Sequence, residues 1–195
     1  MASFSDQIFI DEDYLSEAFP TDLTTEAYLA SRVAARMLCE RQHSRDRFSV
    51  SVAGEAIWIP RRLYFQAVGA VLPVNTFAGT MLRSLQTRSN DGFERQRAAR
   101  DVLGNIQIWS IPFIVALMGE YVHEILLDIE AAMAPALLDG LVGFVTENHA
   151  YWETTKRRVM SYWSAHHRHV YPRSDYVGFR LIEYIEAEVL RVTRS

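Results

Sequence analysis

Glu120 and His123 stand three residues apart in the segment GEYVHEILLDIE, and Glu124 follows the histidine directly. Positions i and i+3 of a helix lie on one side, so this spacing would bring a carboxylate and an imidazole together. Di-iron and di-manganese bundles use two Glu-x-x-His motifs and two further glutamates. The GEYVHEILLDIE segment holds one such motif. Glu120, His123 and Glu124 are therefore a candidate metal site that lacks half of a two-metal ligand set.

The same acidic side has a second interpretation, in which it pairs with the arginines of the preceding helix. The arginines are Arg95, Arg97 and Arg100, and their candidate partners are Glu120, Glu124 and Asp128. If exposed, such pairs would stabilise the fold by only about 0–1 kcal/mol each. This interpretation predicts a structural role for the acidic side instead of a chemical one.

A second candidate site lies near the C-terminus, where basic, histidine and aromatic side chains alternate. Residues 148–195 hold eight Lys or Arg and five Asp or Glu, a net charge of +3. Nucleic-acid surfaces combine bases that contact phosphates with aromatic rings that stack on nucleobases. The alternative is that the aromatic residues are helix core and the histidines are exposed in a loop. The candidate binding residues are Arg157, Arg158, Trp163, His166, His167, Arg168, His169 and Arg173.

The chain lacks the short motifs that mark common enzyme classes. It has no phosphate-binding Walker loop, no nucleophile elbow and no dinucleotide-binding glycine pattern. Leu127 stands where the second histidine of a zinc-protease motif starting at His123 would be. We therefore expect a non-enzymatic protein without a cofactor.

The candidate metal residues depend on the stretch from Asn90 to Met133, which predicts two helices. The first would start at an Asp91–Glu94 capping pair and stop at a left-handed Gly104. Its outer face would carry Glu94, Arg95, Arg97, Arg100 and Asp101. The second would run from Pro112 to Met133, with a buried centre from Ile111 to Ile129.

Residues 47–59 give the one clear β signal, because apolar and polar residues alternate. A two-residue turn at Gly54–Glu55 would place five apolar side chains on one face of a hairpin and Trp58 on the other. Those five are Phe48, Val50, Val52, Ile57 and Ile59.

Helical spacing predicts about seven helices in all. Residues 1–20 are acidic and could be a loosely docked N-terminal arm, and residues 1–195 are expected to form a single domain. Besides the two helices above, the predicted helices cover residues 21–41, 60–73, 75–88, 135–145, 151–166 and 175–192.

The segment from Asn90 to Ile106, with the helix that follows, resembles a HEAT-type helical repeat. Ala99, Leu103, Gly104 and Ile106 match the family pattern, whereas Arg95–Gln96 departs from its aliphatic-Arg pair. The resemblance covers about 40 residues, and no second copy occurs at a fixed period. It implies stacked helix pairs and a scaffold role.

The composition is that of a globular chain with segregated charge. Residues 101–147 contain seven acids and no Lys or Arg, and 19 of the 20 bases are Arg, as in a protein from a GC-rich bacterial genome. No signal peptide or membrane span is evident, and the single cysteine fits a reducing compartment. We expect a cytoplasmic protein.

These observations predict a mainly α-helical interaction or scaffold protein whose partner is a protein. The first alternative is a nucleic-acid-associated protein that uses the C-terminal basic surface. The second is a metal-dependent enzyme with a carboxylate and histidine site on the 112–133 helix.

Overall fold

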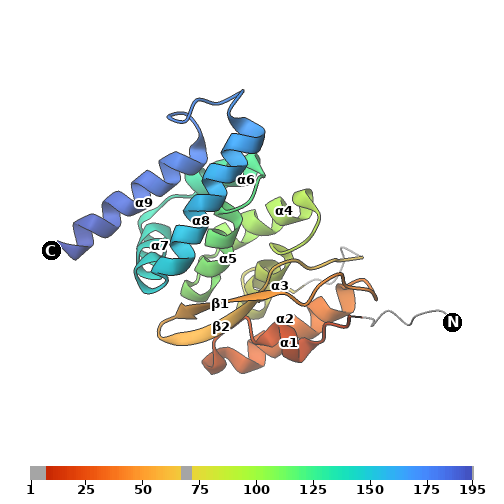
Figure 1. Cartoon of the computed structure of the whole chain (residues 1–195). Helices are drawn as coiled ribbons and strands as arrows, with labels where there is room; N and C mark the ends of the chain where they lie inside the picture. Colours follow the sequence, from red (N-terminus) through yellow and green to blue (C-terminus); the bar gives the residue numbers. More distant parts are fainter. Residues whose placement is uncertain (1–7, 67–71, 195) are drawn as a thin grey trace. The chain divides into compact units, whose positions relative to one another are not determined.

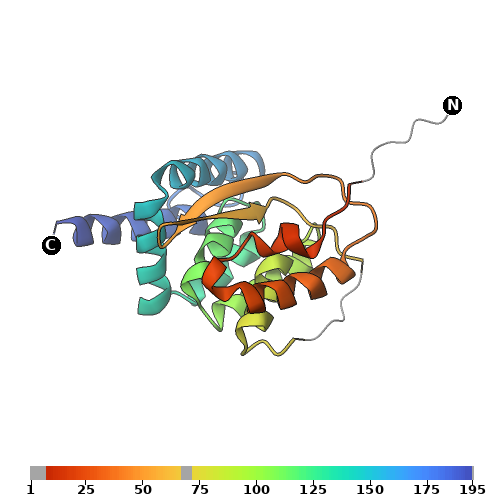
Figure 2. The ribbon, with the colours of Figure 1, turned by 90° about the horizontal axis from the view of Figure 1, so that it is seen from below.

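The structure is a computed structural model that describes residues 8–66 and 72–194. Helices form 62% of the described residues, which hold nine α-helices and one two-stranded antiparallel sheet (Figures 1 and 2). The predicted mainly helical fold with a small hairpin is confirmed. Within the described residues, no helix is both long enough and apolar enough to cross a bilayer.

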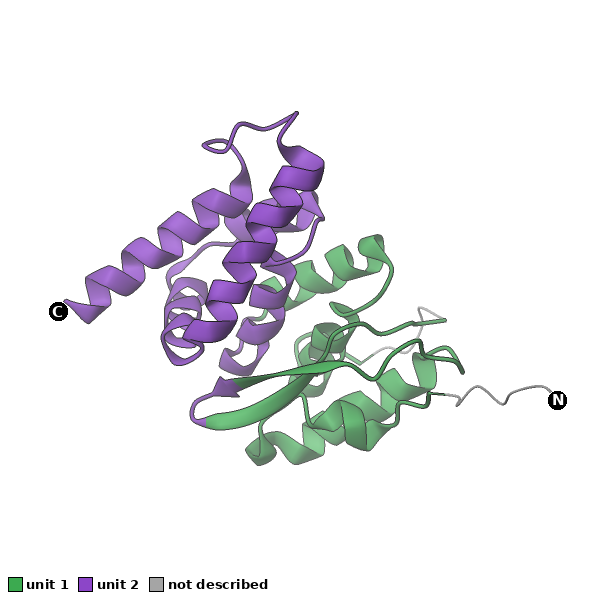
Figure 3. Cartoon of the chain, in the orientation of Figure 1, with its two compact units in different colours: residues 1–50, 55–105 green, residues 51–54, 106–195 purple. Residues whose placement is uncertain are grey.

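The chain forms two compact units, each with its own buried core (Figure 3). Unit 1 comprises residues 1–50 and 55–105, and unit 2 comprises residues 51–54 and 106–195. The single domain expected over the whole chain stays a prediction.

Four helices of unit 1 pack in the order of the sequence. Helix α2 packs against α1 and α3, and α4 packs against α3. Within the predicted N-terminal arm, α1 is capped by Asp11, whose carboxylate accepts a hydrogen bond of 2.9 Å from the Tyr14 amide. Tyr14 and Leu15 are buried. The helices are α1 (Glu12–Ser16), α2 (Thr24–Met37), α3 (Phe77–Gln86) and α4 (Gly92–Leu103).

The hairpin consists of β1 (Arg47–Val52) and β2 (Glu55–Pro60). Its turn is Ala53–Gly54, with φ of +52° and +86°, the signature of a type I′ turn. The turn lies one residue earlier than predicted, which shifts the pairing between the strands by two residues. Because side chains alternate with a period of two, each one stays on its predicted face. All five predicted apolar side chains are buried, and Trp58 is 44% exposed.

The helix predicted over residues 60–73 is wrong in its described part. Leu63 forms a bridge to Ser89, and Phe65 forms one to Leu38. The Leu63 amide donates to the Arg88 carbonyl at 2.8 Å. These residues therefore use their backbone groups for pairing with other segments instead of helical hydrogen bonds. The rest of the predicted apolar stripe, residues 67, 68 and 71, lies outside the described residues.

Two details of α4 differ from the sequence prediction. Gly104 ends the helix with φ of −74°, so the left-handed stop predicted there is wrong. Glu94 and Arg95, predicted on the outer face, are 7% and 1% exposed. Asp91 does cap the helix, because its carboxylate accepts from the amides of Phe93 and Glu94 at 2.8 and 3.0 Å.

Unit 2 is organised around α5, whose eight side chains are all buried. The helix contacts α6, α7 and α8, and α9 packs against α6, α7 and α8. The deep burial predicted for the apolar run that begins at Ile111 is confirmed. The helices are α5 (Ile111–Met118), α6 (His123–Ala131), α7 (Pro135–Glu147), α8 (His149–Tyr162), the π-helical turn η3 (Trp163–His167) and α9 (Val177–Thr193).

Candidate functional site

The helix predicted over residues 112–133 is interrupted, which changes the candidate metal site. Helix α5 ends at Met118 and α6 starts at His123. Gly119 caps α5, and it suits this place because a Cβ there would lie 3.3 Å from the Arg158 Cδ. Glu120 therefore lies in the connection, buried to 6% exposure, and does not share a helix with His123.

The described residues contain no group of three or more His, Cys, Asp or Glu side chains placed to hold a metal ion. Glu124 is exposed on the first turn of α6. The pairing of Arg95, Arg97 and Arg100 with the acidic side would join the two units, and it stays a prediction.

His123 instead belongs to a cluster of stacked rings at the start of α6. Its imidazole stacks on Tyr171, with ring centroids 4.5 Å apart and planes 21° apart. The ring of Tyr176 lies 5.6 Å away on a nearly parallel plane, and that of His167 lies at the same distance. We call His123, His167, Tyr171 and Tyr176 the ring cluster. It joins one residue of the candidate metal site to one of the candidate binding site.

The π-helical turn η3 and the loop after it bring these rings together. Helix α8 leads into η3, and the loop then returns the chain to α9 (Figure 1). His167 Nε2 lies 3.1 Å from the Tyr121 carbonyl oxygen in the α5–α6 connection. His166 stacks on Tyr162 at 6.1 Å. No sequence spacing links residue 123 to residues 167–176, so the cluster could not be predicted from the motifs.

Burial shifts the pKa values of two residues of the ring cluster, His123 and Tyr176. Burial lowers the pKa of His123, and the neighbouring His167 and Arg180 lower it further, whereas Glu124 and Glu130 raise it. Burial raises the pKa of Tyr176 to about 12. The Tyr176 hydroxyl and His123 Nδ1 are buried without a hydrogen-bond partner among the described residues. Both rings are therefore neutral near pH 7 and act as packing groups.

Stability should depend on pH through His123. Its pKa is lower in the folded than in the unfolded chain, where it is about 6.5. As the pH falls through that value, the unfolded chain gains a proton first, so the free energy of unfolding decreases until the folded pKa is reached. We expect the urea midpoint of unit 2 to fall between pH 7.5 and pH 5.5, and to fall less in His123→Phe.

The exposed His169→Gln variant is the control for that measurement, and it should keep the wild-type decrease. An equal decrease in His123→Phe and the wild type would show that another group controls the acid sensitivity.

Four arginines of the candidate binding site lack an acidic partner. No carboxylate of the described residues lies within 4 Å of the guanidinium groups of Arg157, Arg158, Arg168 or Arg173, which we call the unpaired arginine set. Arg157 contacts the Thr154 hydroxyl at 2.9 Å. The set is exposed except for Arg158, which is half-buried.

Three other bases of unit 2 are paired with carboxylates, in contrast to this set. Lys156 lies 2.8 Å from Glu153 and 2.5 Å from Glu186. Arg180 forms a bidentate pair with Glu130, in which Nε donates to Oε1 at 2.8 Å and Nη2 donates to Oε2 at 2.7 Å. The unpaired arginine set therefore leaves positive charge available along α8 and the loop before α9.

The aromatic side chains of this region are used internally. The Trp163 indole donates to the Tyr171 carbonyl at 3.0 Å, and its ring meets the edge of Phe179 at 5.5 Å. Arg173 lies over the Phe179 ring at 4.8 Å from its centroid. Arg168 donates to His169 at 3.3 Å. Trp163 is only partly exposed, so it does not offer the open ring face that the nucleic-acid hypothesis requires.

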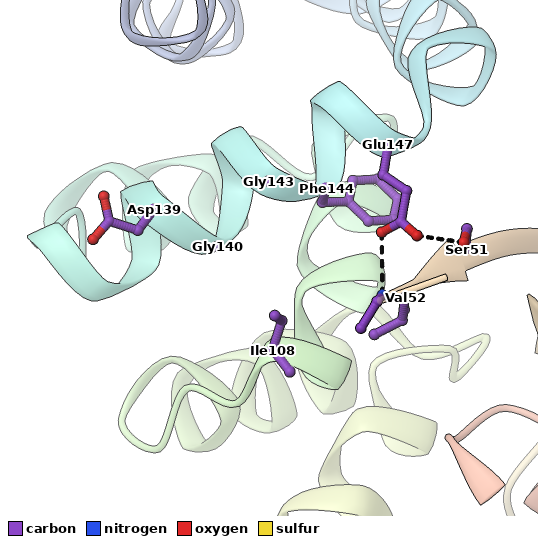
Figure 4. A pocket seen from close by; sticks show the side chains of 9 residues that line it. Ser51, Val52, Ile108, Asp139, Gly140, Gly143, Phe144 and Glu147 are labelled. Carbon is purple, nitrogen blue, oxygen red and sulfur yellow. Dashed lines mark hydrogen bonds between the residues drawn. The ribbon is translucent and has the colours of Figure 1, made fainter. Parts of the chain in front are cut away.

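Unit 2 also holds a pocket of about 130 Å³ beside the hairpin turn (Figure 4). Its wall is mostly apolar and includes Ile108, Gly143 and Phe144. Glu147 lies at the end nearest the turn, and hydrogen bonds from the Ser51 hydroxyl and from the Gly54 and Ala53 amides lower its pKa.

The Glu147 carboxylate is thus held by the turn. Its distances to the Ser51 hydroxyl and the Gly54 amide are 2.5 and 2.6 Å. Asn148 adds to this contact, because its side-chain amide bonds both the Ser51 amide and the Ser51 carbonyl, at 2.7 and 2.8 Å. Glu147 therefore serves the fold, and we assign no chemistry to it.

Comparisons with known protein families, with curated proteins and with solved structures found no match to this chain, so the resemblance of residues 90–130 to a HEAT-type repeat stays a prediction.

Proposed function

We propose that this chain is a non-enzymatic interaction protein that binds an acidic segment of a partner protein through the unpaired arginine set. The observation that carries the proposal is the contrast in unit 2 between paired Lys156 and Arg180 and the four arginines without an acidic partner. Guanidinium groups bind carboxylates in planar, bidentate pairs, so arginines without an acidic partner favour a carboxylate-rich partner protein. The cytoplasmic location expected from the composition is part of this proposal.

A nucleic acid is the second candidate, because phosphates also bind arginine. The ring geometry favours the protein partner. Tyr171 stacks on His123, and Trp163 contacts Phe179 and the Tyr171 carbonyl, so these rings are engaged within unit 2. Single-stranded nucleic acids depend on open aromatic faces for base stacking.

A charge-reversal experiment tests the proposal. The triple variant Arg157→Glu, Arg168→Glu and Arg173→Glu should weaken binding of a fluorescent Asp/Glu-rich peptide about tenfold or more, measured by anisotropy at low salt. These three side chains are exposed, so we expect an unchanged far-UV circular dichroism spectrum.

The matched control reverses three exposed arginines of unit 1, Arg32, Arg36 and Arg41. It changes the net charge by the same amount, so a specific site predicts near wild-type binding by the control. Equal losses in both triples, or no binding of the peptide by the wild type, would refute the proposal. Binding of a DNA or RNA oligonucleotide without binding of the peptide would establish the second candidate instead.

A further inference from the structure

The outward face of α9 carries a line of four residues, which we call the α9 stripe: Glu183, Ala187, Leu190 and Arg194. Spacings of four, three and four residues place them on one side of the helix. Arg194 is the C-cap of α9 and keeps a helical backbone conformation. All four residues are exposed. The helix packs on unit 2 with its opposite side, which includes the buried Ile185.

The C-terminal part of α9 is not covered by the rest of unit 2. No residue from 187 to 194 is buried, and this end of the helix extends away from the neighbouring helices of the unit (Figures 1 and 2). Tyr184, Leu190 and Val192 are large apolar residues that are 50–53% exposed. Because a single exposed leucine is ordinary on a protein surface, the kind of partner must be inferred from the charges that flank it.

The two ends of the α9 stripe have opposite charges. Neither Glu183 nor Arg194 forms an ion pair or hydrogen bond with a described residue. The two residues lie about 16 Å apart along the helix axis, at a rise of 1.5 Å per residue, so they cannot pair with each other. The other charged residues of α9 are paired, Arg180 with Glu130, Glu186 with Lys156, and Glu188 with Arg191.

We propose that α9 pairs antiparallel with α9 of a second copy of this chain, along the α9 stripe. About a two-fold axis midway along the stripe, residue 183 faces residue 194 of the partner copy, and residue 187 faces residue 190. Glu183 then meets the partner's Arg194. Leu190 packs over the small side chain of the partner's Ala187. Spacings of three and four residues are those by which paired helices bury a shared seam.

The charge pattern of the stripe selects both the partner and the direction. A parallel pair would place Glu183 beside the partner's Glu183 and Arg194 beside the partner's Arg194, which is repulsive at both ends. A different protein would need the complementary charges at the same spacing, which the stripe itself supplies. One helix pair of this length buries less than the roughly 1,200 Å² of a standard interface, so the dimer is weak and reversible.

Sedimentation equilibrium of the full chain, at low salt and from about 5 to about 500 μM, tests the proposal. We expect a reversible monomer–dimer equilibrium with a dissociation constant on the order of 10–100 μM. A higher salt concentration should weaken the association, because the ion pairs at the two ends are exposed.

Charge reversal distinguishes the antiparallel from the parallel arrangement. Glu183→Arg and Arg194→Glu should each weaken dimerisation about tenfold or more, since the two-fold axis makes each change replace two attractions by two repulsions. The double variant that carries both changes should dimerise like the wild type, because the swap restores both pairs. In a parallel pair, each single reversal would exchange one like-charge contact for another and leave the affinity unchanged.

Two controls make the same charge changes at exposed positions of unit 1. Glu40→Arg and Arg36→Glu should keep the wild-type association. Leu190→Asn tests the apolar part of the stripe and should weaken dimerisation about tenfold or more. The substituted side chains are exposed, so we expect the far-UV circular dichroism spectrum of each variant to match that of the wild type.

Three results would overturn the proposal. They are a monomer at every concentration up to about 500 μM, unchanged association in both single reversals, and a double variant that associates as weakly as the single ones. The unpaired arginine set lies outside α9. Peptide binding by that set is measured separately, so failure of the dimer and failure of the proposed function are distinguishable.

Discussion

Gly79→Ala is expected to destabilise unit 1 by about 3 kcal/mol, the upper end of the usual cost of overpacking. A Cβ on residue 79 would lie 1.9 Å from the Pro73 carbonyl oxygen and 2.7 Å from its carbon. These are backbone atoms, so they cannot rotate away as a side chain would. The urea midpoint, followed by far-UV circular dichroism, measures the effect.

The close approach at Gly79 has a structural purpose. Thr76 caps α3, since its hydroxyl accepts from the Gly79 amide at 3.1 Å and donates to the Pro73 carbonyl at 2.8 Å. The cap therefore draws the Pro73 carbonyl over the first turn of the helix, where a methyl group would stand. Alanine at residue 79 would break this arrangement as well as overpack it.

Gly104→Ala is the matched control in the same unit. Residue 104 has a helical φ of −74°, and its Cβ would meet the Arg100 and Asp101 carbonyl oxygens at 3.5 and 3.6 Å, which is ordinary contact. It should be neutral or stabilise by up to about 1 kcal/mol. Equal stabilities of the two variants would contradict the packing argument at Gly79.

Trp152→Ala should destabilise unit 2 by about 3–5 kcal/mol. Trp152 is 1% exposed on α8, and its indole donates to Glu186 on α9 at 3.4 Å. Truncation would leave a large cavity and remove this contact between two helices. Urea denaturation followed by circular dichroism avoids the loss of fluorescence that the substitution itself causes.

Tyr184→Ala is the control for that measurement, because Tyr184 lies on α9 and is 52% exposed. We expect a change within about 0.5 kcal/mol for this surface position. Trp152→Phe, which keeps an aromatic ring, should fall between the two. A loss below about 1 kcal/mol for Trp152→Ala would mean that the unit collapses around the cavity at little cost.

Local patterns predicted most of the fold. Alternation over residues 47–59 assigned each hairpin side chain to its correct face even though the turn is Ala53–Gly54, because a shift of two preserves the faces. Helical spacing predicted α7, α8 and α9 in the same way. In these elements the spacing of apolar residues along the sequence matches the period of a strand or a helix.

The failures occur where a distant segment decides the local structure. Leu63 and Phe65 have helical spacing but pair with Ser89 and Leu38. The apolar stripe continues from α5 into α6 across the break at Gly119, because α5 is buried on all sides and α6 buries one face in the same unit. A periodic stripe of apolar residues indicates which side chains are buried. It does not indicate whether the backbone stays helical between them.

The candidate site also divides into features that the local sequence predicts and features that depend on distant segments. The basic and histidine residues of the C-terminal segment were found by composition, and four of the arginines do lack an acidic partner. The ring cluster was missed, since His123 meets Tyr171 only through the folded connection. Polarity predicted Glu94 on an outer face, but this carboxylate is buried.

The Asn148 contact with Ser51 bears on how the hairpin avoids pairing with other chains. Both strands of a two-stranded sheet are edges, and their outward amides and carbonyls can template aggregation. The Asn148 side chain occupies the outward amide and carbonyl of Ser51, as a neighbouring strand would. On β2, the Glu17 carbonyl accepts from the Trp58 amide at 2.8 Å. A side-chain amide and a loop carbonyl thus act as caps against intermolecular strand addition.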